Sequence, residues 1–246
     1  MRVKIFLLRG KGITNTVPLH HQLLILEFIE ELMRDMPIKT DQFSFSSLKG
    51  TSKIQNGFIR FLSSKVTLAL SSNNPEFLEM LVAKIFEHPS INIGKLNLIP
   101  KVHQVMDEPD FKTQMKYVCI SPLIILDPQK DPENCLTQID PSSHQFSDLL
   151  YHSTIENMEK AGFSDEELNS FAEFEATPDM NYVQKINESG KKYARFYKNV
   201  NGDTMLGYLL PFTLHAHPTV HKFIWDCGLG LYTNQGYGMI DVVQEY

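Results

Sequence analysis

The chain has 246 residues, of which 42% are hydrophobic and 21% charged, a balance that is typical of globular proteins and excludes a disordered chain. No stretch approaches the roughly 18 consecutive apolar residues that a membrane helix needs. The net charge of −6 excludes a uniformly basic nucleic-acid binder, but residues 127–179 alone carry −11, so the rest of the chain carries +5.

The cysteine pattern and the N-terminal residues indicate in which cellular compartment the protein works. Cys119, Cys135 and Cys227 are odd in number, far apart and in no CxxC pair. Such spacing predicts no disulfide framework and favours a reducing compartment. The run MRVKIFLLRGKG has a short apolar stretch with basic residues on both sides, which favours a first strand over a signal peptide. We therefore expect a cytoplasmic protein that does not contact a membrane.

The first half of the chain has the pattern of a β-α-β-β-α-β unit. Residues 2–9 alternate as in a strand, and the helical spacing that follows Pro18 ends at Pro37. A second helix begins at Pro75, where a first helical turn tolerates proline. The remaining strands are predicted at 42–48, at 57–63 and 65–70 as a hairpin, and at 91–105 as one strand or a pair.

The second half repeats this order with one added helix. A strand is predicted in the run YVCISPLIIL, a loop at 127–141, a helix at 143–161 and a capped helix in SDEELNSFAEF, where Ser164 precedes Glu167 by three residues. The later elements are predicted as strands at 182–186, 191–200 and 205–215, a short helix from Pro218, and a last strand at 237–243. The predicted domains are residues 1–115 and 116–246.

A glycine-rich loop stands between that last helix and the last strand. Closely spaced glycines allow backbone N–H groups to approach a phosphate without a Cβ in the way. The loop is neither a Rossmann loop nor a P-loop, because it follows a helix and no Lys-Ser/Thr ends it. The alternative is a glycine-rich hairpin that binds nothing. The candidate binding residues of this loop, which the resemblance described next implies to contact RNA, are Gly228, Gly230, Asn234, Gln235, Gly236 and Gly238.

The loop resembles the signature of the repeat-associated mysterious protein superfamily of CRISPR systems. Four other segments, in order along nearly the whole chain, resemble the repeat-processing endoribonuclease of that superfamily, the sixth Cas protein. They are residues 17–22 before the first helix, 43–48 after it, 71–77 before the second helix and 120–123 at the start of the second half.

The resemblance implies an α+β fold of two tandem ferredoxin-like domains and metal-independent cleavage of CRISPR repeat RNA. The ribose 2′-OH attacks the adjacent phosphate and leaves a 2′,3′-cyclic phosphate. It implies no cofactor and no metal, with repeat RNA as the partner and other Cas proteins of an effector complex as further partners. The oligomeric state is expected to be a monomer or a homodimer.

The chain departs from the family in its first helix. Glu30 stands at the family's tyrosine position, and residues 34–42 hold Lys39 but no histidine. The catalytic candidates are therefore His20, His21 and Lys39. On a helix, His21 shares a face with apolar residues and His20 does not, so we expect His20 to be more exposed. The alternative is that both histidines pack or cap the helix start.

Two further groups of residues are candidates for binding. His215, His217 and His221 form H-x-H-x3-H, but proline interrupts them and no fourth ligand has suitable spacing, so a structural or RNA-contacting role is preferred over zinc. Basic and aromatic residues alternate over 191–198, as in surfaces that stack bases and hold phosphates, with ordinary solvated lysines as the alternative. The predicted basic RNA contacts are Lys191, Lys192, Arg195 and Lys198, with Lys49 and Lys53 in the first half.

Three functions compete. The first is an endoribonuclease that cuts CRISPR repeat RNA. The second is a protein of the same fold that binds repeat RNA without cutting it, or a structural subunit of an effector complex, which the missing loop histidine favours. The third is a ferredoxin-like regulatory domain for a small metabolite, which the glycine loop and the ordered resemblances oppose.

Overall fold

The structure, a computed structural model, describes residues 1–10, 14–127 and 139–243. It divides into two compact units, one made of 1–108 with 234–236 and the other of 109–233 with 237–246. The division falls at Glu108 and Pro109, seven residues before the domain boundary that the sequence suggests. Most of the predicted loop at 127–141, including Cys135, lies outside the described residues. No helix of the described part is long and apolar enough to cross a lipid bilayer.

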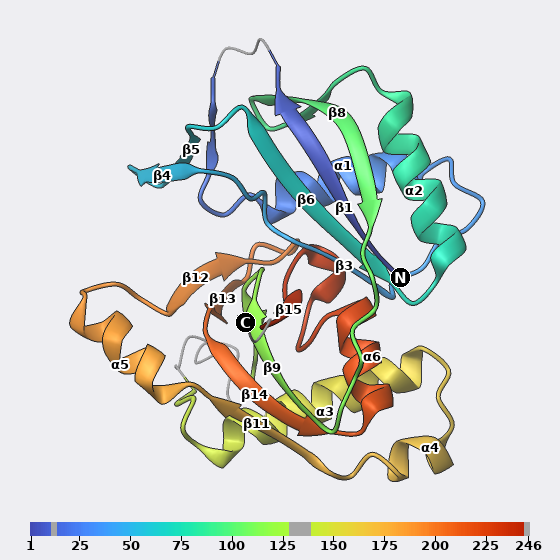
Figure 1. Ribbon diagram of the computed structural model, residues 1–246, viewed down its shortest axis with the longest axis vertical. Coiled ribbons are helices and arrows are strands. Elements are labelled where there is room, and N and C mark those ends of the chain that lie inside the picture. The colour runs from blue at the N-terminus through green and yellow to red at the C-terminus, as the bar shows by residue number, and fades with distance from the viewer. Residues whose placement is uncertain (11–13, 128–138, 244–246) are drawn as a thin grey trace. The chain divides into compact units, whose positions relative to one another are not determined.

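The first unit is built on a five-stranded antiparallel sheet in the order β3-β6-β1-β8-β7. Two helices cover one face of this sheet and bury apolar side chains on it (Figure 1). The elements are β1 (Arg2–Arg9), α1 (Gln22–Met33), β3 (Phe43–Phe45), β6 (Lys65–Ser72), α2 (Pro75–Glu87), β7 (Ile91–Ile93) and β8 (Leu96–Val105). The order β3-β6-β1-β8 with α1 and α2 on one face is that of a ferredoxin-like domain.

The helix ends follow the sequence signals. The side chain of Asn74 accepts a hydrogen bond from the backbone N–H of Phe77 at 3.0 Å, and Pro75 occupies the first turn of α2. Both features are favoured at a helix N-terminus, where backbone N–H groups lack partners within the helix. The helix that the sequence places after Pro18 begins at Gln22 and buries Ile25, Ile29 and Leu32, as the apolar spacing indicates.

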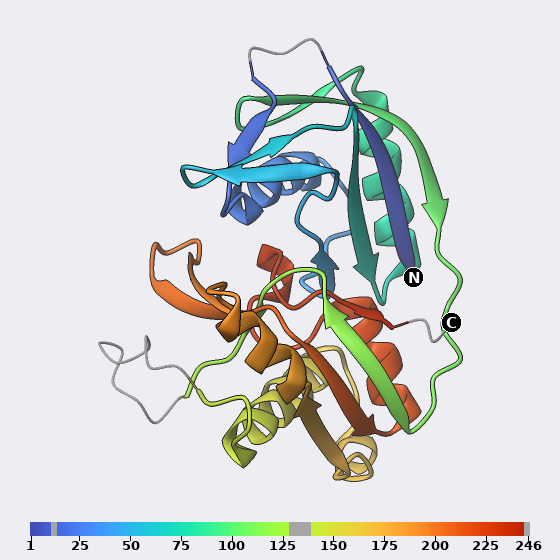
Figure 2. The same cartoon turned by 60° about the vertical axis from the view of Figure 1, so that its left-hand side comes forward.

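A second, three-stranded sheet in this unit has the order β2-β5-β4 (Figure 2). Its strands are β2 (Thr16–Pro18), β4 (Ser52–Gln55) and β5 (Phe58–Phe61). The predicted hairpin of 57–63 with 65–70 is wrong, because β5 pairs with β4 and β2 while β6 pairs with β1 and β3. The reason is the dipeptide Asn56-Gly57, whose positive φ angles of 50° and 77° suit a tight hairpin turn between β4 and β5.

The second unit has a four-stranded antiparallel sheet in the order β11-β14-β9-β15. Helices α3 and α6 contribute most of the helical side chains that pack against it. These elements are β9 (Gln114–Cys119), α3 (His144–Lys160), β11 (Phe174–Pro178), β14 (Pro211–Ala216), α6 (Pro218–Cys227) and β15 (Ile240–Val242). The strand order again is ferredoxin-like, so the predicted tandem ferredoxin-like α+β fold is confirmed.

A three-stranded sheet, β10-β13-β12, and two short helices complete this unit. They are β10 (Leu123–Ile124), β12 (Ala194–Lys198), β13 (Thr204–Tyr208), α4 (Asp165–Asn169) and α5 (Met180–Glu188). The short 3-10 helix η2 (Thr233–Gln235) lies at the division of the chain, with Asn234 and Gln235 in the first unit. The capping box at the start of α4 is confirmed, since Ser164 and Glu167 exchange both hydrogen bonds.

Four element predictions in this unit are wrong in detail. Residues 182–186 lie in helix α5, because the side chain of Asp179 caps it by accepting from the N–H of Tyr182. The predicted strand 205–215 is two strands in different sheets, and the run YVCISPLIIL divides in the same way into β9 and β10. The helix that Ser164 caps ends at Asn169, and β11 begins at Phe174, the last residue of the predicted helical run.

Candidate functional site

His21 is a fully buried histidine with both ring nitrogens hydrogen-bonded. Its Nδ1 lies 3.0 Å from the carbonyl oxygen of Pro18, and its Nε2 accepts from the backbone N–H of Leu48 at 2.9 Å. This pairing requires the neutral ring with its proton on Nδ1. Burial is the main reason why the pKa of His21 falls from 6.5 to about 4. The geometry thus favours the packing alternative for His21.

His20 lies directly before this anchored ring and its side chain is exposed, as its position on the helix pattern indicates. Lys49 is the lysine beside the histidine pair: its charge, like that of His20, contributes to lowering the pKa of His21. Its backbone forms a bridge to Thr67 and follows the Leu48 N–H that His21 binds. His20 and Lys49 thus flank His21, one as its neighbour in the chain and the other as the residue after Leu48, whose N–H His21 accepts.

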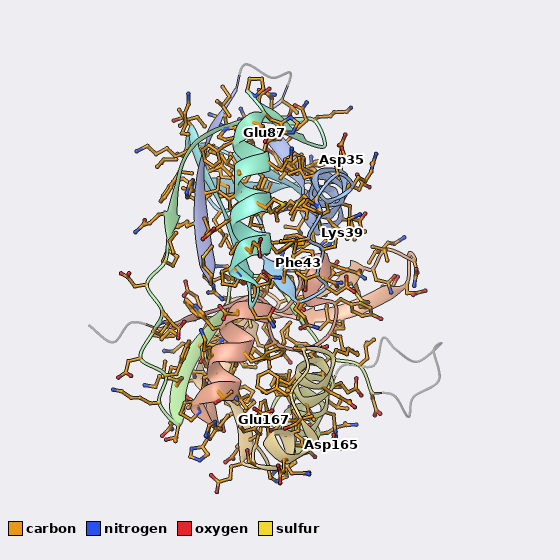
Figure 3. All side chains as sticks on the ribbon, turned by 90° about the vertical axis from the view of Figure 1, so that its right-hand side faces the viewer. Asp35, Lys39, Phe43, Glu87, Asp165 and Glu167 are labelled. Atoms are coloured by element: carbon orange, nitrogen blue, oxygen red, sulfur yellow. The ribbon has the colours of Figure 1, made fainter. Side chains whose placement is uncertain are left out.

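Lys39 lies apart from the histidines. Its Nζ donates to the carbonyl oxygen of Arg34 at 3.3 Å, just past the C-terminal end of α1, and Figure 3 shows it on the segment after that helix. His20 precedes the other end of the same helix. At 1.5 Å per residue, α1 separates the two side chains by roughly 20 Å. Lys39 and His20 therefore lie at opposite ends of α1.

The four glycines of the glycine-rich loop are all buried and have positive φ angles between 69° and 88°. A Cβ on Gly230 would lie 2.6 Å from the carbonyl oxygen of Ile124, and one on Gly238 would meet the backbone of Leu229. The side chain of Asn157 donates to the carbonyl of Gly230 at 3.2 Å. Close packing on the chain's own backbone therefore accounts for these two glycines, whereas Asn234 and Gln235 remain half-buried.

The basic and aromatic residues of 191–198 lie at and before β12, which among the described residues is an edge strand paired with β13. Lys191, Lys192 and Lys198 are exposed and Arg195 is half-buried. Phe196 is 55% exposed, although an aromatic side chain of this size is usually covered. The segment 191–198 therefore offers a ring and three cations to solvent, which fits the RNA-contact prediction without testing it.

The three histidines of the H-x-H-x3-H pattern have separate environments. His221 is buried, with its Nδ1 2.8 Å from the hydroxyl of Tyr117, and burial lowers its pKa. His217 caps α6 by accepting from the N–H of Thr219, and exposed His215 lies 3.8 Å from Glu173. Within the described part of the chain, no three His, Cys, Asp or Glu side chains are placed to hold a metal ion.

Residues 106–242 match the family model described as CRISPR associated protein Cas6, C-terminal. This span is more than half of the chain. The chain belongs to this Cas6 family.

The fold of the whole chain is similar to solved structures of Cas6 proteins. One described as CRISPR associated protein Cas6 is 19% identical, with a TM-score of 0.76 and 99% of each chain covered. A RAMP protein described as binding different RNA substrates is 17% identical, with a TM-score of 0.79 over 99% of this chain and 100% of the other. A Cas6-related protein from Pyrococcus furiosus is 18% identical, with a TM-score of 0.78 over 100% and 99%. No curated protein matches the chain by sequence.

Two features of this Cas6-family chain escaped the sequence reasoning. The first is the place of Lys49 beside the histidines, which depends on the pairing of segments distant in sequence. The second is the outward face of β4 and β5, for which the dipeptide Asn56-Gly57 would have been a sufficient signal.

The second unit also has a hollow of about 440 Å³ on its sheet, with two lysines among its lining residues: Asp110, Lys112, Gln114, Lys116 and Thr213.

Proposed function

We propose that this chain binds CRISPR repeat RNA and cleaves it without a metal ion, leaving a 2′,3′-cyclic phosphate and a 5′-OH. The observation that carries the proposal is the match of residues 106–242 to the Cas6 family, whose members process repeat RNA. The two ferredoxin-like units and the likeness to a RAMP protein described as RNA-binding support it.

The proposed catalytic group is His20, with Lys49 beside the same helix start. His20 in its neutral form takes the proton from the ribose 2′-OH as the 2′ oxygen bonds to phosphorus. The bond from phosphorus to the 5′ oxygen then breaks, and that oxygen takes a proton from water. The ammonium of Lys49 stabilises the added negative charge on the phosphorane. His21 positions the helix start through its bonds to Pro18 and Leu48.

Other basic residues are proposed to hold the RNA rather than to react with it. Lys39 joins them, since α1 separates it from His20. The remaining proposed RNA contacts are Lys53, Lys191, Lys192, Arg195, Lys198, Asn234 and Gln235. The proposed partner is a transcript of the cell's own CRISPR array, which places the protein in the cytoplasm. Assembly with other Cas proteins, and the choice between monomer and homodimer, are further proposals that sedimentation with and without RNA would decide.

A non-cleaving repeat-RNA binder is the second candidate function. The observation that favours it is the locked ring of His21, together with the absence of a histidine from residues 34–42. In that case the fold would retain the RNA-binding surfaces, and His20 would have no role in a reaction.

Cleavage of an end-labelled repeat RNA in EDTA decides between the two. The matched substrate carries a single 2′-deoxyribose at the cut site. We expect the wild type to cut the first RNA and not the second. His20→Ala and Lys49→Gln should each slow cutting by about 10²–10⁴-fold, while His144→Ala, a change at an exposed histidine on α3, should cut normally. Tight binding without cutting would establish the second candidate instead.

A further inference from the structure

The sheet β2-β5-β4 of the first unit presents an outward face with its own chemistry. In its register, Arg60 lies between Thr16 on one side and Lys53 on the other. Phe58 lies in the next outward row, opposite Gln55. Because side chains alternate along a strand, Phe58 and Arg60 share this face.

The other face of the sheet fixes which side points outward. Val17 and Phe61 are buried in the core of the unit, and Ile59 packs against the same core. A slip of β5 by one residue would bury Arg60 and expose Phe61, so the register is strongly specified. Phe58 is consequently held outside the core, where 47% of it is exposed.

The charges on this face are unusual for a chain with net charge −6. Lys53 and Arg60 are directly opposed cross-strand partners, and like charges in that position destabilise a sheet. Residues 1–26 and 42–75, which include all three strands, contain no Asp or Glu. Among the described residues, no carboxylate forms an ion pair with Arg60 or Lys53. An anion between the two cations would remove the repulsion.

The face is also hollowed. A pocket of about 430 Å³ is lined by Asn15, Thr16, Gln55, Asn56, Phe58 and Arg60. The side chain of Asn15 donates to the carbonyl of Phe61 at 3.1 Å, and the N–H of Leu19 donates to the carbonyl of Gly57 at 2.8 Å, which holds the rim in place. The lining thus combines one aromatic ring, one guanidinium and several amide and hydroxyl groups.

We propose that this face is a second RNA contact that takes one unpaired nucleotide, with the base stacked on Phe58 and the phosphate between Arg60 and Lys53. Asn56 and Gln55 line the same pocket, and their amides would bind the edge of that base. Aromatic rings that stack bases beside cations that hold phosphates are the usual means of binding single-stranded RNA. The proposal rests on the proposed function as an RNA-binding protein. It adds a site that adjoins the proposed cleavage chemistry, since Leu19, which precedes His20, donates its N–H to the carbonyl of Gly57 beside Phe58.

The test compares variants of the full chain in binding two RNAs: repeat RNA with a 2′-deoxyribose at the cut site, which is not cleaved, and a duplex of the same sequence. Phe58→Leu, which keeps an apolar side chain and removes the ring, should weaken single-stranded binding about tenfold and leave duplex binding unchanged, since paired bases are not available to stack. Arg60→Gln should lower the slope of log affinity against log salt by about 0.7. Thermal melting of each variant reports whether it is folded.

Matched controls lie in the same unit. Ile54→Thr changes an exposed apolar residue of β4 on the opposite face, and Lys95→Gln removes one exposed charge at the turn between β7 and β8. Both should bind single-stranded RNA as the wild type does. In addition, 4-thiouridine in the repeat RNA should photocross-link to the peptide that contains Phe58.

Each other outcome overturns the proposal in a recognisable way. If the wild type binds neither RNA, the proposed function itself fails. If the wild type binds RNA and folded Phe58→Leu and Arg60→Gln bind equally well, only the second contact is wrong. If Phe58→Leu lost affinity equally for the single strand and for the duplex, the proposed stacking of a base on Phe58 would be wrong. A folded variant that binds RNA normally but no longer assembles with other Cas proteins would make the face a protein-docking surface.

Discussion

At the scale of single residues, the two adjacent histidines before α1 have opposite environments. His21 is fully buried and accepts the N–H of Leu48, whereas His20 is exposed. His21→Ala would leave that buried N–H without an acceptor and open a cavity, so we expect a loss of about 2–4 kcal/mol in unfolding free energy. His20→Ala should change it by less than about 0.5 kcal/mol. Urea unfolding checks both values, and equal stability of the two variants would contradict the structural role of His21.

The same histidine predicts a pH dependence. The pKa of His21 is about 4 in the folded chain against 6.5 otherwise, so the unfolded chain binds the proton first as pH falls. Its contribution is complete above pH 6.5 and decreases toward pH 4, by about 3 kcal/mol in total. Burial lowers the pKa of His221 as well, so His221 also makes stability depend on pH. Comparing the wild type with His21→Asn isolates the contribution of His21, since both proteins contain His221. We expect the variant to lose much less stability between pH 7 and pH 4; parallel curves would refute the assignment.

Gly230 and Gly202 form a matched pair with φ angles of 84° and 85°. Nothing lies within 4 Å of a Cβ on Gly202, but one on Gly230 would lie 2.6 Å from the carbonyl oxygen of Ile124. Gly202→Ala should therefore cost only the backbone strain, about 1–2 kcal/mol. Gly230→Ala should cost about 2–4 kcal/mol because the overlap is added. Denaturation midpoints of both variants measure the difference, and equal losses would show that the loop yields without strain.

At the scale of elements, α2 depends on its N-terminal cap. Asn74 accepts from the N–H of Phe77, while the neighbouring Asn73 is exposed and outside the helix. Asn74→Ala should reduce the unfolding free energy by about 1 kcal/mol, and Asn73→Ala should leave it nearly unchanged. The difference is within reach of urea titration. A cap that contributes nothing would mean that the packing of the buried face of α2 alone fixes its start.

The same elements show what the sequence could and could not specify. The helices at Pro75 and Pro218 were predictable because proline and the apolar spacing agree there. Residues 182–186 were ambiguous, since a short segment with an aromatic and two β-branched residues suits either a strand or a helix, and the cap at Asp179 decides it.

The candidate site, like the secondary-structure elements, was predictable only in part from the sequence. Helical spacing separated buried His21 from exposed His20 correctly. It could not reveal that Lys49 lies beside them, because that contact arises from tertiary pairing and not from sequence distance. The register of β5 is another such case, since it is fixed by which residues the core of the unit accepts.

At the scale of the whole molecule, acidic residues are concentrated in one part of the chain and absent from others. The 13 acidic residues of 127–179 give the chain its negative total, while β2, β4, β5 and β6 lie in segments without carboxylates. Affinity for RNA depends on the phosphates that cations contact and on the counterions they release, and not on the total charge. A protein with a net charge of −6 is therefore compatible with strong, salt-sensitive RNA binding.

This view makes a prediction about removing acidic residues. Asp165 and Glu166 lie in the first turn of α4, where Figure 3 shows Asp165 beside Glu167. Asp165→Asn with Glu166→Gln would change the net charge from −6 to −4, yet we expect the same salt slope for repeat RNA because no phosphate contact is added. The double variant Lys49→Gln, Lys53→Gln changes the net charge by the same amount in the opposite direction, from −6 to −8. It should reduce the slope of log affinity against log salt by about 1.4, because two phosphate contacts are lost. Filter binding between 50 and 300 mM salt measures all three proteins. If the slope followed the net charge in both variants, a long-range field and not local contacts would govern RNA binding.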